Sequence, residues 1–81
     1  MKYDYTNARR TRSALTARSY LADMRKQHPE VTHVVRGIGA EDRHDELRIN
    51  PRDEQVTAFA ALRALFRKYS EVIIVPMKVV H

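Results

Sequence analysis

Cysteine is absent from this chain of 81 residues, which excludes a disulfide framework and any thiolate metal site. The longest apolar stretch runs from Val72 to Val80 and is interrupted by Pro76 and Lys78. It falls far short of the ~20 residues of a membrane helix. The polar, basic N-terminal residues also lack the apolar segment of a signal peptide. We therefore expect a cytoplasmic protein.

Internal repeats, low-complexity segments and linkers are missing as well, so residues 1–81 are expected to form a single domain. A chain of this length buries only ~60% of the surface that its unfolded form exposes, and its stability margin is thin. Oligomerisation would widen that margin.

Recognisable catalytic patterns are the third absence. The sequence Gly37-Ile38-Gly39 lacks the third glycine of a dinucleotide-binding fingerprint. The charged stretch 42–46 lies within one expected loop, whereas catalytic groups converge from separate elements. Neither helical i, i+4 spacing nor the short H-x-H spacing of a metal site occurs among the histidines, which are His28, His33, His44 and His81. We expect no enzyme activity, no metal and no cofactor.

Positive charge, by contrast, is in excess. The formal net charge is +5, and it is unevenly distributed: +5 over residues 1–28, −3 over residues 29–54 and +3 over residues 55–81. Two basic ends with an acidic middle predict an anionic partner, either nucleic acid or an acidic protein surface.

A first helix is expected from Asn7 or Thr11 to Gln27, where Pro29 ends it. Its apolar face is formed by Ala14, Ala17, Leu21 and Met24. Leu15 falls on the opposite side and is either a lone exposed leucine or part of a second contact surface.

A second helix is expected to begin at Asn50, with Asn50 as its N-cap and Pro51 as the first helical residue. Negative charge at Asp53 and Glu54 suits its first turn. The helix is expected to run to about Tyr69 with an apolar stripe of Phe59, Leu62, Leu65, Phe66 and Tyr69.

Three strands are expected, at residues 31–36, 46–49 and 71–80. The first two form a hairpin after the turn residues Gly37 and Gly39, and the last strand lies beside the first. Pro76 predicts an edge position or a bulge. The fold class is therefore α+β, in the order α-β-β-α-β, with a small, mostly antiparallel three-stranded sheet and two helices on one face.

The last strand is apolar on both sides. We expect the helices to cover the side formed by Ile73, Val75, Met77 and Val79. The other side, Val72, Ile74 and Val80, is then exposed and predicts a homodimer or a partner interface.

Six arginines are the candidate binding residues. Arg9, Arg10 and Arg12 are placed unfavourably at a helix start, which predicts a binding role or a flexible basic arm over residues 1–10. Tyr3 and Tyr5 in the same arm are candidates for base stacking. The other three lie along one flank of the second helix; they are Arg52, Arg63 and Arg67.

Two functions remain open. In the first, a small non-catalytic protein acts by protein–protein contact, as an accessory or inhibitor encoded by a phage or mobile element, on an acidic or nucleic-acid-handling partner. In the second, the arginines bind nucleic acid without sequence specificity. The expected strands carry no aromatic residue, so the sheet is not predicted to stack bases. Ten acidic residues among 25 charged ones favour the protein partner.

Overall fold

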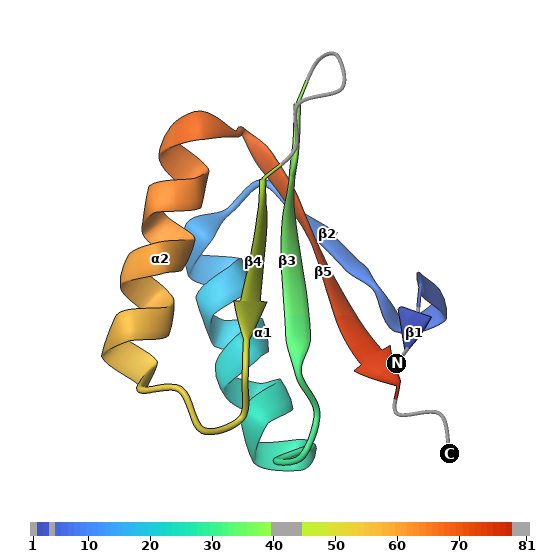
Figure 1. Cartoon of the computed structure of the whole chain (residues 1–81). Helices are drawn as coiled ribbons and strands as arrows, with labels where there is room; N and C mark the ends of the chain where they lie inside the picture. Colours follow the sequence, from blue (N-terminus) through green and yellow to red (C-terminus); the bar gives the residue numbers. More distant parts are fainter. Residues whose placement is uncertain (1, 4, 40–44, 79–81) are drawn as a thin grey trace.

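The computed structural model describes the backbone of residues 2–3, 5–39 and 45–78, and the side chains of residues 6–39 and 45–77. The elements are, in order, β1 (Lys2–Tyr3), the short 3-10 helix η1 (Tyr5–Asn7), β2 (Arg9–Thr11), α1 (Ala14–Gln27), β3 (His33–Ile38), β4 (Glu46–Ile49), α2 (Gln55–Lys68) and β5 (Glu71–Lys78). Both helices lie on the same side of an antiparallel sheet (Figure 1). The α+β class is confirmed.

The sheet is wider than the three strands expected. β3 pairs with β4 and β5, and β5 also pairs on its other edge with β1 and β2 in succession. The strand order is therefore β1 or β2, β5, β3, β4. β5 is an interior strand, because β1 and β2, which fall where an arm or a helix start was expected, pair with its other edge.

The topology explains why both helices share one face. α1 connects the parallel strands β2 and β3, with β5 between them, and α2 connects β4 and β5, with β3 between them. From β2 to β3 the chain crosses the sheet in one direction, and from β4 to β5 it crosses back. β2 and β3 also run antiparallel to β4 and β5, so the two reversals cancel. Crossovers of the same hand then place both helices on the same side of the sheet.

α1 ends at Gln27 as predicted but begins later, at Ala14. The Oγ of Ser13 accepts a hydrogen bond from the backbone N–H of Thr16 at 3.2 Å, which caps the helix at this point. Arg9 and Arg10 lie in the extended backbone of β2 and Arg12 lies in the bend that follows, so none of the three is in the first turn of the helix.

α2 also begins later than predicted, at Gln55, and Asn50 is not its N-cap. The backbone N–H of Asn50 donates to the Asp53 carboxylate at 2.8 Å, and the Asp53 N–H returns a bond to the Asn50 carbonyl at 3.1 Å, closing a turn. Arg25 donates to the carbonyls of Pro51 and Asp53. Those carbonyls would otherwise accept the first helical hydrogen bonds, so the helix starts after them.

The two faces of β5 are interchanged relative to the prediction. Val72 and Ile74 are 0% exposed and belong to the core beneath the helices. The opposite face carries Ile73, Val75 and Met77. A shift of one residue in the pairing register moves every side chain of a strand to the opposite face. Because both faces of β5 are apolar, the alternation of apolar and polar residues could not decide which face meets the helices.

The predicted homodimer rested on an exposed face of Val72, Ile74 and Val80. Two of these residues are in the core, and Val80 lies outside the described residues. The exposed apolar face is therefore absent from the described part of β5, where Val75 and Met77 are buried too.

Pro76 occupies an interior strand without removing a ladder bond. The N–H of its neighbour Met77 donates to the Thr32 carbonyl at 2.9 Å, on the β3 side. The nitrogen of Pro76 therefore points to the other edge. At that edge η1 lies between β1 and β2, and neither of these strands pairs with Pro76.

The core lies between the sheet and the two helices. Its buried members are Ala17 and Leu21 of α1, Ala58, Leu62 and Leu65 of α2, and Val35, Ile49, Val72 and Ile74 of the sheet. The central residues of both predicted helix stripes thus face the sheet, whereas Ala14 at the start of α1 is exposed and Tyr69 lies just after the end of α2. No helix in the described part of the chain is long and apolar enough to cross a membrane.

Candidate functional site

The outer surface of the helix layer carries the exposed apolar residues. Leu15, in the first turn of α1, is 73% exposed, and Val56, in the first turn of α2, is 80% exposed. No other large apolar side chain is exposed in the described ranges. Because Ala17 and Leu21 turn toward the sheet, Leu15 on the far side of α1 faces solvent.

A groove of about 190 Å³ lies between the two helices, next to Leu15. The buried side chains of Phe59 and Leu62 form its apolar floor. Arg18 of α1 and Arg63 of α2, both exposed, line it as well. The groove therefore combines an apolar floor with two positive charges.

Arg18 is held in place by an aromatic ring. Its guanidinium carbon lies 4.8 Å from the centroid of the Phe59 ring, within the range of a cation–π contact. This contact joins α1 to α2 across the groove.

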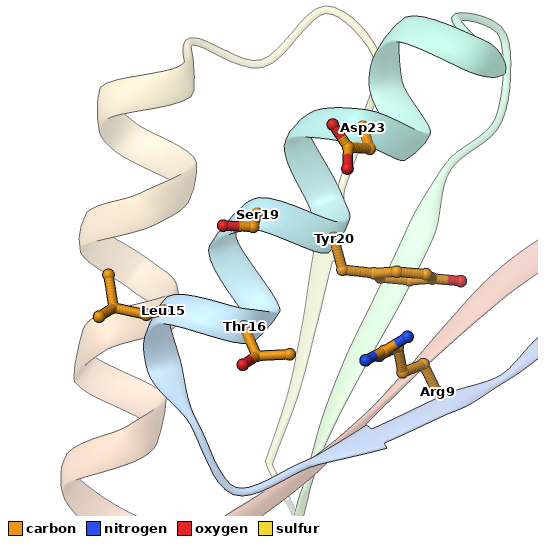
Figure 2. Close-up of a pocket in the computed structure, with 6 residues that line it drawn as sticks. All are labelled: Arg9, Leu15, Thr16, Ser19, Tyr20 and Asp23. Carbon is orange, nitrogen blue, oxygen red and sulfur yellow. The ribbon is translucent and has the colours of Figure 1, made fainter.

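A second hollow, of about 340 Å³, lies on the other flank of α1 (Figure 2). Arg9 of β2 reaches beneath the ring of Tyr20, with its guanidinium carbon 5.4 Å from the ring centroid. The Tyr20 hydroxyl is 3.4 Å from the carbonyl of Asn7, to which it donates, so the ring is tied to the N-terminal edge. The remaining lining residues are Leu15, Thr16, Ser19 and Asp23.

The structure separates the three N-terminal arginines. Arg9 is paired with Ile74 and lies on the helix side of the sheet, whereas Arg10 is paired with Ile73 and lies on the opposite side. Arg10 and Arg12 both donate to the Glu71 carboxylate, through Nε atoms at 2.9 and 3.0 Å. These hydrogen bonds, first from Arg10 and then from Arg12, hold the pKa of Glu71 below its usual value.

The arginines near α2 do not form one flank. Arg52 lies in the turn before the helix, so the helical spacing assumed for it does not apply. Arg63 lines the groove and Arg67 lies in the last turn. Arg63 and Arg67 are four residues apart, so they are separated by about 6 Å along the helix axis. The six predicted arginines are therefore distributed over both sides of the molecule.

Several of the predicted positions are not among the described side chains. The side chains of Tyr3 and Tyr5, the acidic loop residues 40–44 and Val80 lie outside the described residues.

His33 is the one buried polar residue of the described core, 1% exposed on the helix side of β3. Burial lowers its pKa, and the charges of His28 and Arg25 lower it further. Its Nδ1 and the Nη1 of Arg25 are buried without a hydrogen-bond partner. Within the described ranges, His, Cys, Asp and Glu side chains do not gather in groups of three that could hold a metal ion.

Sequence reasoning missed Arg18 and assigned Phe59 only to the core. The available signal was the spacing of Leu15 and Arg18, three residues apart on the outward side of an amphipathic helix. The partner ring could not be predicted, because it comes from another helix.

What the site offers is apolar contact surface and guanidinium donors. In comparisons with known proteins, no family model, no curated protein and no solved structure matches this chain.

Proposed function

We propose that this protein is a non-catalytic binding module that acts as an accessory or inhibitor by contacting an acidic protein partner through its helix layer. A single observation carries the proposal: the two exposed large apolar residues of the described chain, Leu15 and Val56, both lie on this layer, where Arg18 and Arg63 line the groove. Leu15 continues into the apolar floor of the groove, and an exposed apolar surface of this kind is typical of an interaction site.

The composition of the groove supports a protein partner. Interface cores combine apolar floors with arginine and aromatic side chains, as Phe59 and Arg18 do here. With this role we propose a cytoplasmic location, which the cysteine-free composition favours.

The distribution of arginines favours this role over nonspecific nucleic-acid binding. A phosphate backbone is bound best by a continuous basic surface. Here Arg10 and Arg12 share one carboxylate on the far side of the sheet from Arg9. The experiment must therefore distinguish a protein partner from nucleic acid.

The test is an affinity capture from native cytoplasmic extract, with and without nuclease. Leu15→Asp and Val56→Asp introduce a charge at the proposed contact and should each abolish a nuclease-resistant complex. The matched control is Thr57→Asp, because Thr57 is exposed but lies on the side of α2 away from the groove.

Loss of the complex on nuclease treatment would reject the proposal. So would equal capture by the wild type, Leu15→Asp and Val56→Asp. Circular dichroism of each variant establishes that the fold is retained.

A further inference from the structure

Arg9 and Arg18 share an arrangement that sets them apart from the other arginines in the described part of the chain. Each guanidinium carbon lies within cation–π distance of a ring, 5.4 Å from the centroid of Tyr20 for Arg9 and 4.8 Å from that of Phe59 for Arg18. A guanidinium has five N–H donors, so a ring contact leaves donors that can bind a carboxylate. Neither makes an ion pair with another residue in the described ranges.

The arginines of the opposite sheet face differ in this respect. Arg10 and Arg12 donate to Glu71, and Arg36 donates to Glu46. Their donors already bind carboxylates within the molecule, so these three arginines are less available to an acidic ligand.

Leu15 lies between Arg9 and Arg18. It lines both the groove that contains Arg18 and the hollow that contains Arg9. A ligand that covers Leu15 therefore has a guanidinium on either side, that of Arg18 in the groove and that of Arg9 in the hollow that Figure 2 shows.

We propose that this surface binds an acidic segment of a partner protein in which an apolar side chain is flanked on both sides by carboxylates. The apolar side chain covers Leu15 and enters the groove above Phe59. One carboxylate binds Arg18 and the other binds Arg9. The inference rests on the proposed function and specifies the chemistry of the partner at that same site.

A protein segment fits this surface better than a phosphate backbone does. Leu15 gains nothing from a phosphate but is buried by an apolar side chain, and burial of a leucine is favourable.

The probe is a capped synthetic peptide with a Glu-Glu-Leu-Glu-Glu centre and glycine–serine flanks, titrated into the isotope-labelled full chain and followed by NMR. We expect amide shifts confined to α1 from Ala14 to Tyr20, to Arg9 and to α2 around Phe59. Replacing the peptide glutamates by glutamine, or its leucine by alanine, should weaken binding. Raising the salt concentration should weaken it as well, because exposed charges are screened.

Three variants give the expected magnitudes. Arg9→Gln and Arg18→Gln should each weaken peptide binding roughly 2–5-fold, the range of exposed ion pairs. Leu15→Ala should weaken it about tenfold. Arg18→Lys keeps the charge but loses the planar fork, so it should bind no better than Arg18→Gln. Arg10→Gln, on the other sheet face, is the matched control and should bind like the wild type.

Several results would overturn the inference: no shifts at ~5 mM peptide, where even a millimolar complex is populated; equal binding of the glutamine peptide; or full retention of binding in the Arg9→Gln, Arg18→Gln double variant. An oligothymidylate that binds the same residues more tightly than the peptide would also reject it. If cytoplasmic capture depends on Leu15 but the peptide does not bind, the proposed function stands and only this partner chemistry fails.

Discussion

At the scale of single residues, His33 has an environment that disfavours the protonated, positively charged imidazole. It is buried in β3, its pKa is lowered by burial, and Arg25 and His28 add positive charge nearby. The folded state therefore holds the imidazole neutral at pH values where the unfolded chain, with a pKa near 6.5, takes up a proton.

Acid should thus destabilise the protein through His33. The folded pKa lies below the unfolded one, so stability is fully present above about pH 6.5 and falls as the pH drops toward the folded pKa, by at most ~1.4 kcal/mol per pH unit for one group. Urea unfolding between pH 8 and pH 5 measures this. In His33→Leu, which keeps the other histidines, the dependence over that range should flatten. An unchanged slope would show that another group is responsible.

Gly37 is the second residue with a specific steric role. It lies within β3, not in a turn as expected, and a Cβ built on it would be 2.3–2.7 Å from the ring of Tyr69. The glycine is required for the close approach of a ring from the end of α2 to the sheet.

Gly37→Ala should therefore lower the free energy of unfolding by about 1–3 kcal/mol, the usual cost of overpacking. Chemical denaturation of Gly37→Ala, Tyr69→Ala and the double variant provides the test. We expect the alanine at position 37 to cost much less once the Tyr69 ring is removed. An equal cost in both backgrounds would contradict the steric explanation.

At the scale of elements, the helices could be predicted but the N-terminal edge could not. The stripes of α1 and α2 have clear helical periodicity, and both face the core. β2 has only three residues, two of them arginine, and carries no strand pattern. It is a strand because β5 presents an unpaired edge, which is a tertiary cause that local sequence does not contain. Without β1 and β2, the sequence predicts β5 as an edge strand, which the structure corrects for the same reason.

The cap of α1 links an element boundary to the candidate site. Ser13 fixes the start of the helix, and Leu15 and Arg18 follow within its first two turns. Ser13→Ala removes the cap and should cost about 1 kcal/mol of stability. Ser13→Asp, which can also cap and adds a favourable charge at the N-terminus, should restore it. Thermal melts compare the two. Equal melting temperatures for Ser13→Ala and wild type would argue against the cap.

At the scale of the whole molecule, the two surfaces differ in how their charges are used. On the open face of the sheet, Arg10 and Arg12 are paired with Glu71 and Arg36 is paired with Glu46, while Arg48 is exposed. On the helix side, Arg9 and Arg18 contact aromatic rings beside the exposed Leu15. The ring contacts and the exposed apolar residues coincide on one side, and this asymmetry underlies the proposed function.

The candidate site could be predicted from the sequence only in part. Helical periodicity left Leu15 on the outward side of its helix, as the structure shows, whereas the anionic partner inferred from net charge stays a prediction. The placement of Arg9 beneath Tyr20 and of Arg18 on Phe59 depends on contacts between separate elements. The sequence does not show on which side of a strand an arginine lies or which side chain it contacts. The six candidate arginines could therefore not be assigned to separate surfaces.

The most direct test of the central claim is the NMR footprint of the captured partner on the isotope-labelled protein. We predict that the partner perturbs amides of α1 from Ala14 to Tyr20 and of α2 from Val56 to Arg63, and leaves β3 and β4 around Arg36 and Arg48 unaffected. A footprint on that open sheet face, with α1 and α2 unperturbed, would contradict the claim that the helix layer is the binding surface.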